Sequence, residues 1–170
     1  ETALDYLAEA IFNQTCFGVS IFAAILVYGR KRIGYLLGNK IMVFLHGTAT
    51  KPATWDVIGQ SFAHYVPTGK AVEKLKKWVD QGAQICYLTS HEKAAGVEID
   101  KQVLAKYGFP QGEIYWRQNG EAYKDVAERV MPDILIEDDC ESIGGEAEMT
   151  YPHIREDLKP KIKSIVVKEF

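Results

Sequence analysis

The sequence lacks the cysteine spacing of a disulfide scaffold or a zinc site. Its three cysteines, Cys16, Cys86 and Cys140, lie far apart and form no CxxC or CxH pair. Disulfide frameworks and cysteine-based zinc sites both depend on such closely spaced ligands. This cysteine usage favours a reducing compartment, and we expect a cytoplasmic location.

An excess of positive charge is also missing. The chain has 20 basic and 23 acidic residues among 170, which gives a formal net charge of −3. Proteins that bind duplex nucleic acid neutralise its phosphates with clustered lysine and arginine, so nucleic acid is not an expected partner. Hydrophobic residues make up 47% and charged residues 25%. This balance excludes an intrinsically disordered chain and fits one folded domain of ordinary size.

One stretch near the N-terminus contains no charge at all. Residues 11–28 are uncharged and mostly apolar, and a basic cluster, residues 30–32, follows them. A membrane-spanning helix needs about 20 mostly apolar residues, and a basic flank marks its cytoplasmic side. We therefore interpret residues 1–39 as an N-terminal hydrophobic helical segment. It is either a membrane anchor that holds the rest of the chain on the cytoplasmic side or a docking helix.

From residue 40 to residue 170, short apolar runs alternate with amphipathic segments. Strands are expected at 41–45, 85–88, 113–116, 133–136 and 164–167, and helices at 71–79, 93–107 and 121–130. Strands of this length separated by helices are typical of a parallel sheet with helices on both faces. Residues 49–69 contain Pro52, Gly59, Pro67 and Gly69, and are expected to form a short irregular insertion.

Polar residues follow three of the expected strands. In an open parallel sheet, ligands bind beyond the carboxyl ends of the strands, so these residues are candidates for a common site. The candidates for phosphate binding are Gly47, Thr48, Thr89, Ser90 and the helical Lys124, and the candidates for a metal are Glu137, Asp138 and Asp139. Hydroxyl and N–H groups suit phosphate oxygens, whereas carboxylates suit a hard cation such as Mg²⁺.

The order of these motifs resembles that of the haloacid dehalogenase-like superfamily, over about residues 40–168. Its four motifs are matched by Phe44-Leu45-His46-Gly47-Thr48, Thr89, Lys124 and Glu137-Asp138-Asp139. The resemblance implies a three-layer α/β/α sandwich with a mainly parallel Rossmann-like sheet and a minimal cap at 49–69. It also implies Mg²⁺-dependent phosphatase chemistry, with a phosphorylated small molecule or protein as ligand.

The first motif departs from that superfamily, which has Asp-x-Asp-Gly-Thr. Phe44 stands in place of the aspartate nucleophile and cannot attack phosphorus. His46 stands in place of the general acid/base, a role that imidazole can perform near neutral pH. The loss of two carboxylates also weakens the expected Mg²⁺ site. The expected function is therefore a catalytically impaired phosphatase-type domain that binds a phosphorylated or anionic ligand. An active Mg²⁺-dependent phosphohydrolase that works through His46 is the alternative.

A second alternative is an esterase related to the α/β-hydrolases. The segment 43–47 resembles their oxyanion loop, and Ser90, Asp133 or Asp138, and His153 follow the order of their catalytic triad. The Gly-x-Ser-x-Gly turn of that family is absent around Ser90.

The histidines outside the first motif give no metal-binding pattern in the sequence. His64, His91 and His153 each occur without a second histidine four residues away. We expect each of them to be solvated or satisfied by packing, and not to bind a metal.

Overall fold

The computed structural model describes residues 38–54 and 61–170. The strands are β1 (Lys40–Phe44), β2 (Thr50–Pro52), β3 (Tyr65–Pro67), β4 (Gln84–Leu88), β5 (Ile114–Tyr115), β6 (Ile134–Glu137) and β7 (Lys163–Val166). The α-helices are α3 (Ala71–Asp80), α4 (Ala94–Tyr107) and α5 (Tyr123–Val130). Short 3-10 helices are η1 (Phe62–His64), η2 (Gly145–Glu148), η3 (Tyr151–His153) and η4 (Lys159–Lys161).

The predicted anchor or docking helix at 11–28 lies outside the described residues. Within the described ranges, no helix is long and apolar enough to cross a membrane.

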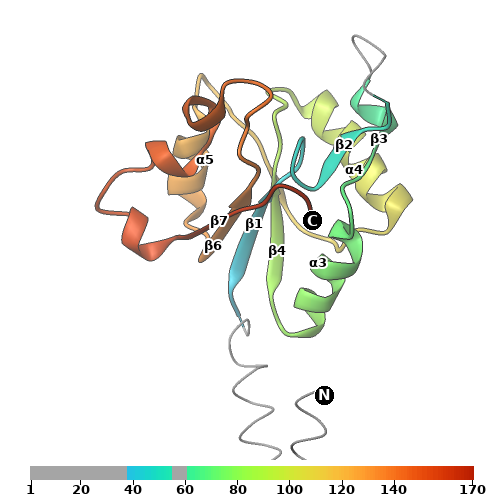
Figure 1. The fold of residues 1–170 in the computed structure, drawn as a ribbon, viewed down its shortest axis with the longest axis horizontal. Helices are drawn as coiled ribbons and strands as arrows, with labels where there is room; N and C mark the ends of the chain where they lie inside the picture. Colours follow the sequence, from blue (N-terminus) through green and yellow to red (C-terminus); the bar gives the residue numbers. More distant parts are fainter. Residues whose placement is uncertain (1–37, 55–60) are drawn as a thin grey trace, which may run out of the picture. The chain divides into compact units, whose positions relative to one another are not determined.

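Five strands form one parallel sheet in the order β5-β4-β1-β6-β7. The chain runs from central β1 outward to β4 and β5, then returns across β1 to β6 and β7 (Figure 1). This reversal of direction is the arrangement of a Rossmann-like sheet, which places a topological switch point between β1 and β6. The predicted α/β class with a parallel sheet is confirmed.

The central strands β1, β4 and β6 are mostly apolar because both faces of the sheet are covered there. One core lies between the sheet and helices α3 and α4, and a second lies between the sheet and α5 (Figure 1). Successive residues of β1 alternate between these cores, so that Ile41 and Val43 belong to the first and Met42 to the second. This alternation explains why the strands appear in the sequence as unbroken hydrophobic runs.

The described residues of the segment 49–69, which are 49–54 and 61–69, form regular elements that the sequence did not predict. Its ends form an antiparallel pair in which β2 lies against β3, with Thr50 opposite Pro67 and Pro52 opposite Tyr65. η1 directly precedes β3. Proline cannot donate to a ladder, but a two-stranded pair leaves one side of each strand free of that demand. Because of these prolines, the sequence pattern predicted an irregular segment where the structure has a hairpin.

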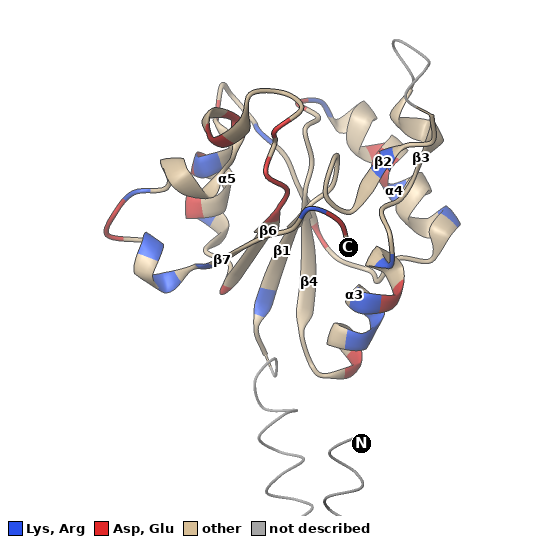
Figure 2. Cartoon of the chain, in the orientation of Figure 1, with Lys and Arg blue, Asp and Glu red and all other residues tan. Residues whose placement is uncertain are grey.

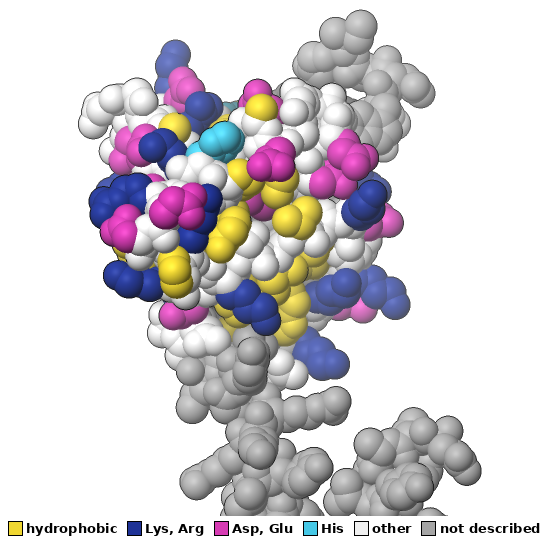
Figure 3. All heavy atoms as spheres, turned by 60° about the vertical axis from the view of Figure 1, so that its left-hand side comes forward, with side chains coloured by type: hydrophobic (Ala, Val, Ile, Leu, Met, Phe, Trp, Pro, Cys, Tyr) yellow, Lys and Arg dark blue, Asp and Glu magenta, His cyan; other side chains and the backbone are white. Residues whose placement is uncertain are grey.

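β7 forms one edge of the sheet. Figure 3 turns the molecule so that the side of α5 and β7 comes forward, and shows apolar side chains surrounded by side chains of both charges. Val166 of β7 is half exposed, whereas Lys163 at the start of the strand is exposed. Charged residues at a sheet edge oppose pairing with another chain.

The loops that follow β1, β4 and β6 meet at the same edge of the sheet, because these three strands are neighbours. These are the loops to which the sequence assigned the polar candidates.

Candidate functional site

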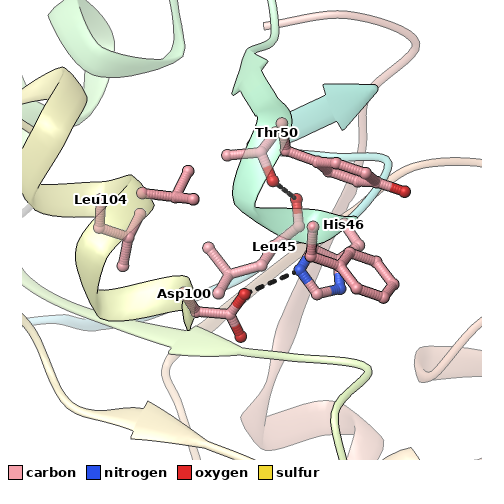
Figure 4. A pocket seen from close by; sticks show the side chains of 8 residues that line it. Leu45, His46, Thr50, Asp100 and Leu104 are labelled. Atoms are coloured by element: carbon pink, nitrogen blue, oxygen red, sulfur yellow. Dashed lines mark hydrogen bonds and ion pairs between the residues drawn. The ribbon is translucent and has the colours of Figure 1, made fainter. Parts of the chain in front are cut away.

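His46 lies at the centre of a hydrogen-bond network at this edge. Its Nδ1 is 2.5 Å from Ser90 Oγ, and its Nε2 is 3.0 Å from Asp100 Oδ1. Figure 4 shows Asp100 pointing from α4 toward the imidazole. The His46 side chain is 8% exposed and that of Asp100 is 3% exposed. The loops after β1 and β4 and the helix α4 are therefore joined by a partly buried series of hydrogen bonds, Ser90–His46–Asp100.

Asp100 determines which ring nitrogen of His46 donates a hydrogen bond and which accepts one. An ionised carboxylate only accepts hydrogen bonds, so its contact places the ring proton on His46 Nε2. The Nδ1 lone pair is then free to accept from the Ser90 hydroxyl. The other oxygen of Asp100 accepts a hydrogen bond from Thr89 Oγ1 at 2.6 Å, which holds the carboxylate in place. Thr89 therefore orients Asp100.

Two aromatic residues cover the imidazole. Phe62 of η1 stacks on His46 with ring centroids 4.1 Å apart, and Tyr65 of β3 meets its edge at 5.3 Å. Stacking restricts the rotation of the ring and limits the access of water to it. The β2–β3 hairpin, which was not predicted from the sequence, thus supplies part of the site.

His91 lies beside this network. Its ring is perpendicular to that of His46, with centroids 5.3 Å apart, and its Nε2 is 3.6 Å from Asp100 Oδ1. Burial lowers the pKa of His91, although the Asp100 carboxylate partly opposes this shift. The ring packs against α4 where Gly96 has no side chain, because a Cβ there would overlap His91 Nδ1.

A cavity of about 320 Å³ opens in front of His46 and Ser90. Its walls come from the ends of β1 and β6, so it lies at the topological switch point of the sheet, where Rossmann-like folds bind ligands. Its lining includes the aromatic residues Phe62 and Tyr65 and the acidic residues Asp138 and Glu148. None of the described residues around this cavity is a lysine or an arginine. The cavity therefore favours a neutral or cationic ligand.

Gly47 and Thr48 hold Asp138. Thr48 Oγ1 donates to Asp138 Oδ1 at 2.7 Å and accepts from the Asp138 backbone N–H at 2.9 Å. Gly47 has φ +95°, and a Cβ at this position would lie 3.1 Å from both carboxylate oxygens of Asp138. Glycine is therefore required here both for its backbone conformation and for the close approach of a carboxylate.

The three acids at the end of β6 and directly after it have separate partners. Figure 2 shows acidic residues in red along this part of the chain. Glu137 is buried and accepts hydrogen bonds from the backbone N–H groups of Thr150 and Tyr151 at 2.6 and 2.9 Å. Burial raises the pKa of Glu137, and these hydrogen bonds limit the shift. Asp139 lies 3.8 Å from Lys168. The structure does not gather Glu137, Asp138 and Asp139 around one point.

The remaining sequence candidates have other partners, although Phe44 also lines the cavity in front of His46. Lys124 of α5 pairs with Asp125 at 3.7 Å and lines a different hollow. Phe44 packs edge-on against Tyr123, with ring centroids 4.8 Å apart. Asp133 accepts from the Lys40 N–H at the opposite end of the strands from Ser90, and His153 Nε2 lies near the carbonyl oxygens of η2. Neither of these last two residues is a partner of Ser90.

Neither Asp100 nor the role of His91 in the site was predicted from the sequence. The signal for Asp100 was its place on α4, where the buried residues are Gly96, Val97, Asp100, Val103 and Leu104. A charged residue on the apolar face of a helix is rarely buried without a partner. The signal for His91 was Gly96, since a buried glycine inside a helix indicates close packing by a neighbour.

Cys140 lines the same cavity, and its surroundings disfavour the reactive thiolate. Burial, reinforced by Asp138 and the other nearby acids, raises the pKa of Cys140 to about 12. Only the thiolate reacts with alkylating agents, so we expect native Cys140 to react with iodoacetamide at pH 8 at least about 100-fold more slowly than in urea. Peptide mass spectrometry measures the two rates for this one cysteine. Equal rates in both solvents would contradict the prediction.

The comparisons with known proteins bear on the fold. No family model matches the chain, and no curated protein is similar to it. Two solved structures of the Pnkp1/Rnl/Hen1 complex, the second called an RNA repair complex, are similar, each with a TM-score of 0.55. Identities are 18% and 17% over 77% and 78% of this chain, which spans 46% and 44% of the matched chains. An uncharacterized protein from Listeria monocytogenes serotype 4b is 15% identical, with a TM-score of 0.48 over 77% of this chain and 92% of that one.

These findings correct the resemblance to the haloacid dehalogenase-like superfamily. No family model places the chain there, and the two solved structures with a TM-score of 0.55 are described in other terms. The residues that suggested the resemblance are polar side chains at the carboxyl ends of parallel strands, a placement that many unrelated α/β proteins share. What the comparisons show is a Rossmann-like α/β fold.

Proposed function

We propose that the chain is a hydrolase of small carboxylic esters in which Ser90 is the nucleophile. The observation that carries the proposal is the chain of contacts from Ser90 Oγ through His46 to Asp100, with Ser90 and His46 facing the cavity. A serine hydroxyl is a weak nucleophile until an adjacent base accepts its proton, and a third group must orient that base. His46 and Asp100 are placed for these two roles.

The reaction would proceed in two balanced steps. Ser90 Oγ attacks the acyl carbon while its proton passes to His46 Nδ1, and Asp100 stabilises the charged ring through Nε2. The proton on Nδ1 then passes to the leaving alkoxide as the carbon–oxygen bond of the ester breaks. In the second step a water molecule attacks the acyl carbon of the acyl-enzyme while one of its protons passes to His46 Nδ1. That proton then passes to Ser90 Oγ as the bond between Ser90 and the acyl group breaks, which releases the carboxylic acid. Relative to serine proteases, the two ring nitrogens of the histidine exchange roles.

The charges around the cavity support an ester substrate over a phosphorylated one. Asp138 and Glu148 lie on its wall, whereas Lys124 lines another hollow. The hydroxyl of Thr48 is committed to Asp138, and that of Thr89 to Asp100. A phosphate dianion would therefore meet like charge and few free donors.

The test is hydrolysis of p-nitrophenyl acetate by the wild-type chain and by Ser90→Ala. We expect ester turnover that Ser90→Ala lowers by at least about 10³-fold, because the nucleophile is lost. Ser164→Ala, which removes a serine hydroxyl from β7, is the matched control and should keep the wild-type rate. p-Nitrophenyl phosphate should not be turned over. Wild-type ester turnover no faster than that of Ser90→Ala would refute the proposal.

A further inference from the structure

Three metal-binding side chains converge where His46 meets α4. One ligand atom from each of His46, His91 and Asp100 lies within 4.8 Å of the others. The Asp100 carboxylate is 3.0 Å from His46 Nε2 and 3.6 Å from His91 Nε2. Tetrahedral zinc with bonds near 2.1 Å has ligand atoms about 3.4 Å apart, so these contacts are close to the separations that the ion requires.

His91 supplies a second, independent observation. Its Nε2 is buried and has no hydrogen-bond partner among the described residues. A buried polar atom without a partner is costly, and structures rarely leave one unused. A metal ion bound between His46, His91 and Asp100 would give this nitrogen its missing partner.

The surroundings hold the three ligands in place. Gly96 and Asp100 are one turn apart on α4, and the missing side chain of Gly96 lets the His91 ring lie beside the carboxylate. The second Asp100 oxygen is held by Thr89, and His46 Nδ1 is held by Ser90. Such outer contacts orient the ligands of metal sites and raise their affinity.

We propose that His46, His91 and Asp100 bind one divalent transition metal ion of the Zn²⁺ type. Two imidazoles and one carboxylate suit Zn²⁺ or Co²⁺, whereas Mg²⁺ prefers six oxygen ligands. This site shares no ligand with the acids at the end of β6.

The metal site has a consequence for Ser90 that rests on the proposed esterase activity. An ion bound to His46 Nε2 moves the ring proton to Nδ1, because a neutral imidazole carries only one proton. Nδ1 can then no longer accept the proton of Ser90. Metal binding and ester hydrolysis therefore exclude each other, and we expect Zn²⁺ to inhibit the esterase.

The experiment is a competition titration of the 170-residue chain against a chromophoric zinc chelator. We expect one Zn²⁺ per wild-type chain, Co²⁺ binding with the visible absorption of a tetrahedral ion, and no competition by Mg²⁺. His91→Gln should weaken Zn²⁺ binding at least about 100-fold. His64→Gln removes an exposed histidine of η1 and is the matched control, with wild-type affinity expected.

Gly96→Ala is a second test that removes no ligand. The added methyl would occupy the place of the His91 ring, so we expect Zn²⁺ affinity to fall at least about 10-fold while circular dichroism shows an intact helix content. Wild-type affinity in His91→Gln, or no binding by the wild-type chain, overturns the metal site. Zn²⁺ binding by a chain without esterase activity upholds the metal site and refutes only the proposed function.

Discussion

Asp100→Asn is expected to leave the chain folded and to lower the turnover number for p-nitrophenyl acetate by about 10⁴-fold. Asparagine has the shape of aspartate and can still accept from Thr89 Oγ1 through its carbonyl oxygen. Its amide group then faces His46 and donates, which forces the ring proton onto Nδ1. The imidazole would present a proton to Ser90 where it must present a lone pair.

The control is Glu98→Gln, which makes the same chemical change on the exposed face of the same helix. Its partner is Lys101, and neither residue touches the imidazole. We expect wild-type turnover in this variant. Thermal unfolding of both variants separates a loss of activity from a loss of fold. If folded Asp100→Asn keeps more than a tenth of the turnover, Asp100 does not orient the base.

The sheet could be predicted from the sequence because its central strands β1, β4 and β6 are buried on both faces. An apolar run such as 85–88, followed by polar residues and then a helix, is typical of a parallel α/β sheet in a chain of this size. The edge at which the candidate site lies also followed from this pattern. His46 and Ser90 were therefore predicted to lie near each other, and the structure places them 2.5 Å apart.

The partners of these residues could not be predicted in the same way. Asp100 approaches His46 from a helix 54 residues later in the chain, and only the packing of α4 on the sheet brings the two together. The rings of Phe62 and Tyr65 contact the imidazole. Both residues belong to a segment in which prolines argued against strands, so the β2–β3 pair was not predicted. Long-range contacts of this kind depend on tertiary packing, which local periodicity does not record.

Thr48 shows that residue type alone does not identify the partner of a side chain. A threonine after a strand is chemically able to bind phosphate, and the sequence assigned it that role. The structure shows the hydroxyl engaged twice with Asp138, from the loop after β6. Since hydroxyl and carboxylate groups that converge at one sheet edge can bind either a ligand or each other, the residue types alone do not decide between the two.

Thr48→Val is expected to lower the free energy of unfolding by about 2–4 kcal/mol. Valine fills the same volume but cannot bond with Asp138, so it leaves a carboxylate oxygen without its donor and a backbone N–H without its acceptor. Thr68→Val is the matched control, because Thr68 is also buried yet its Oγ1 has no partner among the described residues. Removing that hydroxyl should leave stability unchanged within about 0.5 kcal/mol or raise it. Urea unfolding at equal m-values measures both changes, and equal losses in the two variants would show that the Thr48–Asp138 pair does not stabilise the junction between β1 and β6.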